Sequence, residues 1–272
     1  MKILVMGGSG YVGSILIPLL RKKNTVRNFD VQHLVKFMFN PERADDFLKS
    51  KDIIIYLASM SNNDACEKYP AVAKLANQDN FVVIMKAAKN EGVKHVIYAS
   101  SVAAYGSGEN FIEDDPLNPT TIYGQGKKFC EEYLETQDVP YTIVRAATVC
   151  GWSPKMRWDT TVNKMVHDGL KGTITLNGGE QKRCHVNIKD LCDFYELILD
   201  KPQNETYNVV GLNQQLNHTA YTVAALTHSR IIVKERTDDR SYTISGQKAW
   251  RVLGWLPLHS IGDAVADIFA HV

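Results

Sequence analysis

Tyr123 and Lys127 stand four residues apart in the segment Tyr-Gly-Gln-Gly-Lys. Residues at this spacing share one face of a helix, so the two side chains would lie together. A tyrosine accepts a proton near neutrality only when its ordinary pKa of about 10 falls toward 7, which requires roughly 4 kcal/mol in favour of the phenolate. One cation about 4 Å away in water supplies about 1 kcal/mol, whereas a lysine in a dry cleft beside a second positive charge could supply more. The pair therefore predicts proton transfer; its alternative is an exposed pair of helix side chains.

Ser100 and Ser101 directly follow the apolar run His95–Ala99. If this run is a parallel strand, both serines lie at its carboxyl end, where open α/β sheets bind their ligands. A hydroxyl at that position can hydrogen-bond the substrate oxygen whose proton a tyrosine removes. The alternative for Ser101 is a cap of a turn or helix.

Gly7, Gly10 and Gly13 follow the apolar run Ile3–Met6 and precede the amphipathic stretch Ile15–Leu20. At a strand-to-helix turn, glycines let the chain turn tightly, let a pyrophosphate approach the backbone and let the helix pack on the strand. The start of the helix then offers free N–H groups and its positive dipole end to the phosphates. The segment predicts a dinucleotide-binding turn.

Asp30 ends the next predicted strand, Val26–Phe29. It follows Gly7 at close to the roughly 20-residue spacing of an acid that hydrogen-bonds the adenosine ribose. Such an acid repels a 2′-phosphate, so NAD is favoured over NADP, and an oxidised nicotinamide would be the second positive charge beside Lys127. One alternative is that Asp30 only forms a turn. Another is that Arg27 faces the ribose, which would favour NADP over NAD.

Short apolar runs alternate with helical patterns over the first two thirds of the chain, which is typical of parallel β-α-β units. The expected fold is α/β: a Rossmann-type doubly wound parallel sheet with a smaller mixed C-terminal substrate lobe. Predicted strands are Ile3–Met6, Val26–Phe29, Val35–Phe39, Ile53–Leu57, His95–Ala99, Tyr141–Arg145 and Thr206–Val209. Predicted helices are Val12–Lys22, Ala71–Asn90, Tyr123–Gln137, Ile188–Leu199 and Ile261–Ala270. We expect an NAD-binding domain over 1–148, with a returning segment 185–212, and a substrate-binding lobe over 149–184 and 213–272.

The order and spacing of five segments resemble the extended short-chain dehydrogenase/reductase superfamily. The branch that they resemble is the NAD-dependent nucleotide-sugar epimerase/dehydratase family, of the UDP-glucose 4-epimerase type. The segments are residues 7–13, 56–59, 98–106, 123–127 and 183–190. The likeness extends over nearly the whole chain.

The resemblance implies hydride chemistry on a sugar. Tyr123 would take the proton from a sugar hydroxyl, commonly the 4-hydroxyl, while that carbon gives a hydride to NAD. Lys127 would hold the nicotinamide ribose and favour the phenolate. The family places its catalytic Ser/Thr four residues before the Tyr-Gly pair that stands here at residues 105–106, which selects Ser101 rather than Ser100. The implied NAD contacts are Gly7, Ser9, Gly10, Tyr11, Val12, Gly13, Asp30, Leu57, Ala58, Ser59, Asn77, Ser100, Tyr123 and Lys127.

Val102 and Ala103 follow the predicted catalytic serine. A 4,6-dehydratase of this family carries an Asp-Glu pair there to expel water, and neither apolar side chain can transfer a proton. The resemblance therefore favours an epimerase that regenerates NAD in each cycle. A 4-ketoreductase or sugar dehydrogenase is the alternative, and a third reading is a sensor protein that binds NAD without catalysis.

The smaller lobe is expected to hold a nucleoside-diphosphate sugar. Arg183 matches a family arginine that contacts the substrate phosphate, and Asn163 matches an asparagine at the start of a helix in that lobe. A second phosphate arginine is expected at Arg236 or Arg240, and Thr148 stands where some epimerases have asparagine. For each arginine, the alternative is a surface ion pair. Lys155 and Arg157 could serve either the substrate or the fold.

Composition limits the remaining classes. The 272 residues include 31 basic and 30 acidic side chains, so no overall charge suggests nucleic acid or a membrane surface. We expect no signal peptide, because no long apolar stretch follows a basic start in the first residues, and no apolar run has membrane-spanning length. Five scattered cysteines predict a reducing, cytoplasmic location. No metal site is predicted, because the histidines lack metal-ligand spacing. His185 is interpreted as a packed histidine, and a homodimer is the family expectation.

The sequence departs from the family in one further place. Members usually carry Gly-Asp after the third strand, where the aspartate holds the adenine, and Phe39-Asn40 stands here instead. The loops after Asp30, Phe39 and Asn213 are also short for the family.

Overall fold

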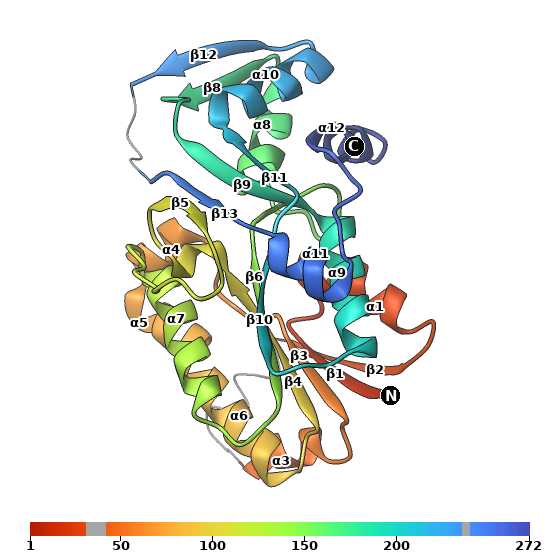
Figure 1. Cartoon of the computed structure of the whole chain (residues 1–272). Helices are drawn as coiled ribbons and strands as arrows, with labels where there is room; N and C mark the ends of the chain where they lie inside the picture. Colours follow the sequence, from red (N-terminus) through yellow and green to blue (C-terminus); the bar gives the residue numbers. More distant parts are fainter. Residues whose placement is uncertain (31–41, 236–239) are drawn as a thin grey trace.

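Six of the predicted strands form one parallel sheet at the centre of the larger lobe (Figure 1). The computed structural model describes residues 1–30, 42–235 and 240–272. The strand order is β10-β6-β4-β3-β1-β2, and every neighbouring pair is parallel. The strands are β1 Lys2–Met6, β2 Thr25–Phe29, β3 Ile53–Tyr56, β4 His95–Ser101, β6 Tyr141–Ala146 and β10 Glu205–Val209. The predicted strand Val35–Phe39 lies outside the described residues.

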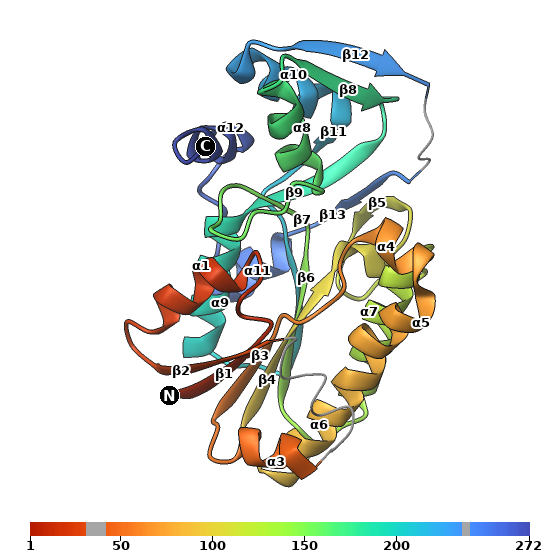
Figure 2. The ribbon, with the colours of Figure 1, turned by 180° about the vertical axis from the view of Figure 1, so that it is seen from behind.

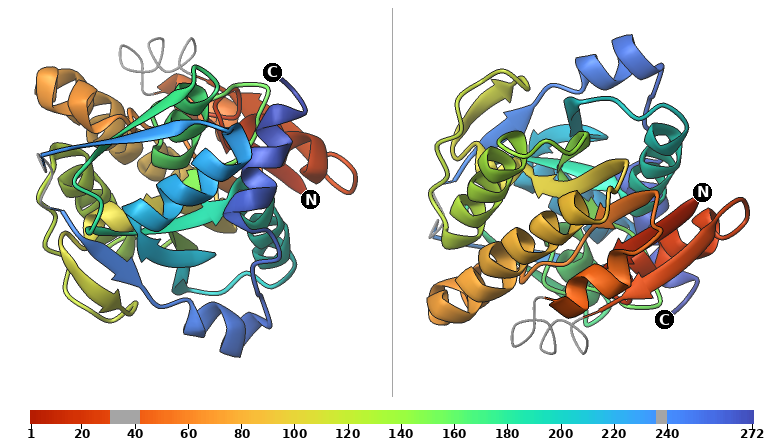
Figure 3. Two further views of the ribbon diagram at one scale, coloured as in Figure 1. Left: turned by 90° about the horizontal axis from the view of Figure 1, so that it is seen from above. Right: turned by 90° about the horizontal axis from the view of Figure 1, so that it is seen from below.

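Helices cover both faces of this sheet because its inner strands, β1, β3, β4 and β6, are mostly apolar on both sides. In β1, Ile3 and Val5 face one core while Leu4 and Met6 face the other. The first face packs against α1 Gly13–Leu20, α9 Ile188–Asp200 and α11 Gln247–Leu253. The second packs against α3 Glu42–Leu48, α6 Asn80–Asn90 and α7 Ile122–Glu135. Views along the vertical axis show the strands between these two layers (Figure 3).

The helix predicted over Ala71–Asn90 is a succession of three helical segments. These are α5 Pro70–Lys74, the π-helical turn η1 Leu75–Asp79 and α6 Asn80–Asn90, and the short helix α4 Asn63–Lys68 precedes them. A π-helical turn places one extra residue in the helix, and such turns often occur at functional sites. Here the turn carries Asn77, whose side chain is buried.

The smaller lobe has its own sheets and core (Figure 2). Strand β9 Lys182–Asn187 lies between β7 Thr148–Cys150 and the antiparallel β11 Leu212–Gln215. Strands β8 Thr173–Asn177 and β12 Arg230–Lys234 form a separate parallel pair. Buried apolar side chains come from α8 Thr161–Gly169, α10 Leu216–Thr227 and α12 Ile261–Phe269.

A short two-stranded pairing brings the late part of the chain back to the larger lobe. Strand β13 Tyr242–Ile244 pairs in parallel with β5 Gly108–Phe111, which follows β4 and the 3-10 turn η2 Val102–Ala104. Backbone N–H groups of Gly108 and Ser245 extend the pairing on both sides.

The predicted fold class is confirmed: a Rossmann-like parallel sheet with a smaller mixed lobe. The proposed boundaries at 148, 184 and 213 remain a prediction. Within the described part of the chain, no helix combines the length and the apolar character needed to cross a membrane.

Candidate active site

A cavity of about 780 Å³ lies between the carboxyl edge of the large sheet and the smaller lobe. Both lobes supply its walls. Of the predicted site residues, those that line it are Gly7, Gly10, Tyr11, Val12, Gly13, Asp30, Leu57, Ala58, Ser59, Ser100, Ser101, Tyr123, Lys127, Thr148, Arg183 and Arg240. Arg236 lies outside the described residues. Ser9, Asn77 and Asn163 are not in the cavity wall.

The turn after β1 depends on the small size of its glycines. Gly7 has φ +79°, and a Cβ there would stand 2.7 Å from the backbone of Ala58. A Cβ on Gly13 would stand 2.5 Å from the Cα of Gly8, so the helix packs directly on the turn. Helix α1 has no side-chain cap, and the N–H groups of Tyr11, Val12 and Gly13 meet no acceptor among the described residues. The cavity is therefore open to an array of unused donors and the positive end of a helix.

Asp30 is connected to this turn through Ser9. The N–H of Ser9 donates to Oδ2 of Asp30 at 2.8 Å, and Nδ2 of Asn28 donates to the Ser9 hydroxyl at 2.8 Å. The Asp30 carboxylate, which lines the cavity, is thus placed at the end of β2 with backbone support. Ser9 therefore positions the side chain of Asp30 and does not itself line the cavity.

Tyr123 and Lys127 lie on the first turns of α7, as the spacing predicted. The hydroxyl of Thr121 caps this helix by accepting from the N–H of Gly124 at 3.1 Å. A Cβ on Gly124 would stand 2.4 Å from the carbonyl oxygen of Ala103, so the missing side chain lets α7 approach η2. This close approach brings the tyrosine and the segment after β4 to one cavity.

Lys127 is buried, with 3% of its surface exposed. Its Nζ donates to the carbonyl oxygen of Ala99 at 2.6 Å and stands 4.9 Å from the centre of the Tyr98 ring. The same nitrogen is 5.5 Å from the centre of the Tyr123 ring. A positive charge in this setting is shielded little by water, so it acts strongly on a nearby developing anion.

Ser101 ends β4 and caps η2, so the capping alternative describes its local role. Its Oγ accepts from the N–H of Ala103 at 3.2 Å. A hydroxyl that accepts one hydrogen bond still has its own hydrogen to donate. Because Ser101 also lines the cavity, this hydrogen is available to a substrate oxygen. Val102 and Ala103 line the same wall.

Two predicted cofactor residues have side chains engaged within the protein. The Ser100 hydroxyl donates to Oε1 of Glu131, and that carboxylate is paired with Arg145. Oδ1 of Asn77 accepts from the N–H of Met60 at 2.7 Å and from the hydroxyl of Ser59 at 3.1 Å. Asn77 therefore holds the segment after β3 in place.

Arg183 and Arg240 lie beside each other on the smaller lobe's wall of the cavity. Arg183 has 5% of its surface exposed, and its guanidinium lies 4.9 Å from the centre of the Tyr242 ring. Its Nη1 donates to the carbonyl oxygens of Lys182 and Arg240. Thr148 lines the same cavity and pairs in register with the fully buried His185.

Asn163 is completely buried, and its polar atoms meet the backbone and Tyr11. Its Oδ1 accepts from the N–H of Gly151 at 3.0 Å, and its Nδ2 donates to Tyr11 Oη at 3.0 Å and to the carbonyl oxygen of Arg157 at 3.0 Å. Asn163 therefore holds Tyr11 and Gly151 together, and its predicted contact with the substrate stays a prediction.

Four polar residues of the cavity wall form a cluster that the sequence did not identify as such. Arg157 donates from Nη1 to the Ser61 hydroxyl at 2.6 Å and from Nη2 to Asp159 at 2.7 Å, and Asn62 donates to Asp159 at 2.8 Å. The hydrogen bond from Arg157 lowers the pKa of Asp159 to about 2. Only the position of Ser61 and Asn62 after β3 was a signal, because strand ends in such sheets carry ligand contacts.

His185 shows the chemistry of a packed residue. Neither ring nitrogen has a hydrogen-bond partner, and burial lowers the pKa of the imidazole to about 4. Within residues 1–30, 42–235 and 240–272, no three histidine, cysteine or acidic side chains gather as a metal site would require.

Comparisons with known proteins identify a family for this chain. The model of the NAD dependent epimerase/dehydratase family matches residues 3–210. UDP-glucose 4-epimerase of Lactobacillus helveticus is 27% identical, over 98% of this chain and 95% of its own length. GDP-6-deoxy-D-talose 4-dehydrogenase of Aggregatibacter actinomycetemcomitans is 30% identical, over 77% of this chain and 74% of its own.

The fold has a similar neighbour among solved structures. UDP-glucose 4-epimerase of Thermotoga maritima, solved with UDP-glucose, matches with a TM-score of 0.88 and 22% identity, covering 99% of both chains. The family model spans well over half of the sequence. The chain therefore belongs to the NAD dependent epimerase/dehydratase family, and NAD is its cofactor.

Proposed function

We propose that this protein epimerises a nucleoside-diphosphate sugar, at C4, through a transient 4-keto intermediate. The observation that carries the proposal is the arrangement of Ser101, Tyr123 and Lys127 around one cavity. The apolar pair Val102 and Ala103 occupies the same wall, so no acid pair is present there to expel water.

The residues of the larger lobe fit NAD. The unused N–H groups at 11–13 and the dipole of α1 suit its pyrophosphate, and Asp30 suits the adenosine ribose. Leu57, Ala58 and Ser59 extend this wall, and Asn77 fixes their course. Bound NAD supplies a hydride acceptor and donor for the sugar carbon.

The chain's own residues move the proton. Tyr123 is proposed to accept the proton of the 4-hydroxyl and to return it after the ketone is reduced. Lys127 stabilises the phenolate, since its buried ammonium has donors beyond the one given to Ala99. Ser101 hydrogen-bonds the oxygen that becomes the ketone. Positioned acid–base groups of this kind contribute about 10²–10⁴-fold to rate.

The smaller lobe is proposed to bind the substrate diphosphate. Arg183 and Arg240 bring two guanidinium groups to the cavity wall, and Arg183 is held in place by its stacking on Tyr242. A planar guanidinium group can donate two parallel hydrogen bonds to two oxygens of one phosphate. Thr148 and Arg236 remain proposed substrate contacts.

Epimerase and dehydrogenase differ in the fate of the hydride, which gives the test. Purified protein is offered UDP-, GDP-, CDP- and dTDP-hexoses that carry deuterium at C4. Epimerisation should yield the C4 epimer with deuterium still at C4, by NMR, and no net absorbance change at 340 nm. With NAD added in excess, stoichiometric formation of the deuterated reduced cofactor, which absorbs at 340 nm, would instead establish the 4-dehydrogenase activity that the Aggregatibacter relative suggests as the second candidate. No conversion of any sugar would refute both.

Tyr123→Phe is the matching variant. Turnover should fall by about 10²–10⁴-fold because the proton acceptor is lost while the ring remains. Tyr221→Phe changes a tyrosine that is 62% exposed on α10 and should leave the rate unchanged. Equal rates in Tyr123→Phe and the wild type would remove the proposed proton transfer.

We also propose a cytoplasmic homodimer. Tyr69, Val72 and Phe129 are exposed apolar side chains on or beside α5 and α7, which pack against each other (Figure 1). Light scattering should give twice the chain mass for the wild type, and Val72→Glu with Phe129→Glu should give a monomer. All five cysteines are buried free thiols, which suits a reducing compartment.

A further inference from the structure

We propose that Arg157 and Asp159 hold a strap of the smaller lobe closed over the bound dinucleotide and so control how slowly NAD leaves. The strap is defined here as residues 151–160, between β7 and α8. The inference requires NAD in the cavity but not the identity of the sugar, so it can fail independently of the proposed epimerisation.

One end of the strap is fastened to the glycine turn by buried hydrogen bonds. The Tyr11 hydroxyl donates to the carbonyl oxygen of Gly151 at 2.6 Å, and the Ser153 hydroxyl donates to the carbonyl oxygen of Tyr11 at 2.7 Å. The hydroxyls of Ser14 and Ser153 are 2.7 Å apart, and Ser153 is 1% exposed. Asn163 holds Tyr11 and Gly151 together. Water therefore competes little for the hydrogen bonds at this end, because Tyr11, Ser153 and Asn163 are buried.

The other end is fastened to the segment after β3. Arg157 donates to the hydroxyl of Ser61 at 2.6 Å and to Asp159 through Nε at 3.0 Å and Nη2 at 2.7 Å. Asn62 donates to Asp159 at 2.8 Å. The side chains of Arg157 and Asp159 are 30% and 36% exposed, so water can replace these bonds. We call this group of four residues the latch.

The two attachment points lie on neighbouring strands. Tyr11 follows β1 and Ser61 follows β3, and these strands pair directly in the sheet. Gly7 and Ala58, which come directly after β1 and close after β3, line the cavity together with Lys155 and Arg157 of the strap. A dinucleotide held along the carboxyl ends of β1 and β3 therefore leaves freely only after one attachment opens. The latch is the exposed one.

The sign of two substitutions separates a latch from a simple charge effect. If Arg157 merely attracts the anionic dinucleotide, then Arg157→Gln speeds NAD release and Asp159→Asn, which removes a repelling charge, slows it. If the pair is a latch, both substitutions speed release. The expected increase is roughly 2- to 5-fold for each, because each variant loses a partly exposed ion pair. The double variant should release NAD no faster than about the faster single one.

The experiment measures the dissociation of radiolabelled NAD from the loaded full-length protein, by filtration after adding excess unlabelled NAD. Lys164→Gln breaks a comparable ion pair with Asp168 on α8 and should leave the rate unchanged. Ser61→Ala removes an acceptor of Arg157 that belongs to the segment after β3 and leaves the strap itself unchanged. This variant should also speed release, so it tests the latch even if an Arg157 variant folds poorly. Wild-type rates in Arg157→Gln and Ser61→Ala, or slower release from Asp159→Asn, would overturn the proposal.

Discussion

Two arginine–carboxylate pairs among the described residues have the same shortest donor–acceptor distances but lie in very different surroundings. In both, Nη2 stands 2.7 Å from a carboxylate oxygen and Nε donates at 3.0 Å. Arg145 and Glu131 lie inside the larger lobe with side chains 6% and 1% exposed, whereas Arg157 and Asp159 are 30% and 36% exposed. The same kind of ion pair can therefore form a contact that stays closed in the core and a contact that opens at the surface.

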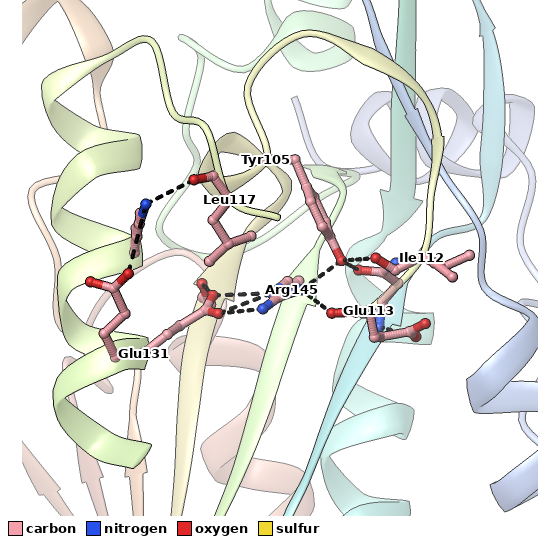
Figure 4. Close-up of polar contacts among 10 residues, drawn as sticks. Tyr105, Ile112, Glu113, Leu117, Glu131 and Arg145 are labelled. Atoms are coloured by element: carbon pink, nitrogen blue, oxygen red, sulfur yellow. Dashed lines mark hydrogen bonds and ion pairs between the residues drawn. The ribbon is translucent and has the colours of Figure 1, made fainter. Parts of the chain in front are cut away.

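The buried pair is satisfied on every side. Figure 4 shows Arg145 between Glu131 of α7 and the residues of the β5 region; its Nη1 donates to the Tyr105 hydroxyl and to the carbonyl oxygen of Glu113, both at 2.8 Å. The hydroxyl of Ser100 donates a further hydrogen bond to the carboxylate of Glu131. The pair therefore fixes α7, which carries Lys127, against β6, and Ser100 ties the same carboxylate to β4, which ends in Ser101. A buried ion pair with this many partners specifies geometry more than it adds stability.

Removing one partner of the buried pair should give the largest effect. Glu131→Leu leaves the Arg145 charge buried and unpaired, so the free energy of unfolding should fall by about 3–5 kcal/mol, measured by urea denaturation. Combining it with Arg145→Met should recover most of this loss, because no lone charge remains. A loss under about 1 kcal/mol in the single variant would contradict the contrast between the pairs.

Acid should weaken the core before it weakens the latch. Burial lowers the pKa values of His95 and His185 to about 4, from 6.5 in the unfolded chain. The unfolded state therefore binds protons first, so stability is full above pH 6.5, falls as the pH drops to 4, and loses up to about 3 kcal/mol per histidine. Asp159, with its pKa of about 2, contributes its stabilisation above pH 3.8 and loses it only as the pH falls through 2.

The measurement is unfolding free energy and NAD release at pH 7, 5.5 and 4.5. Stability should fall over this range while the release rate from folded protein stays constant. His185→Leu should flatten the stability profile, because its ring has no hydrogen-bond partner to strand. A profile of the same slope in that variant would show that another group titrates.

Breaking the exposed pair should cost little stability. Arg157→Gln is expected to lower the free energy of unfolding by less than about 1 kcal/mol, since half-exposed ion pairs contribute little. Urea denaturation of the apoprotein measures this without the stabilisation that bound NAD adds. A loss as large as that of Glu131→Leu would mean that the strap is part of the core.

Salt should have the smallest effect and only on the exposed pair. Raising the ionic strength from 0.05 to 0.5 M screens charges near water, so NAD release from the wild type should rise by about twofold. In Asp159→Asn this dependence should diminish, because the screened pair is gone. If the salt dependence of NAD release is unchanged in Asp159→Asn, the salt acts by screening the phosphates of NAD and not the Arg157–Asp159 pair.

Local patterns in the sequence predicted much of the fold. Each described strand of the large sheet begins and ends within two residues of its predicted apolar run, because these runs are bounded by turn residues and the inner ones are buried on both faces. The spacing of Tyr123 and Lys127 predicted their shared helix face, and the strand end predicted where Ser101 lies.

Contacts between distant segments could not be predicted. Arg157 meets Ser61 across 96 positions, and Asn163 meets Tyr11 across 152, so no local pattern marks either contact. The helix predicted over Ala71–Asn90 was wrong in one respect, because its apolar spacing does not reveal the π-helical turn that directs Asn77 to Ser59. These details follow from tertiary packing that overrides local propensity.

The pairing of β13 with β5 has a consequence for synthesis of the chain. Ser101, Tyr123 and Lys127 all leave the ribosome before residue 130, but Arg240 and Tyr242 come more than a hundred residues later and complete the cavity wall. Strand β10, which covers the edge of β6, is also late. The nascent chain therefore holds its reactive residues on an incomplete sheet with an open edge, before the residues proposed to bind the substrate diphosphate have been synthesised.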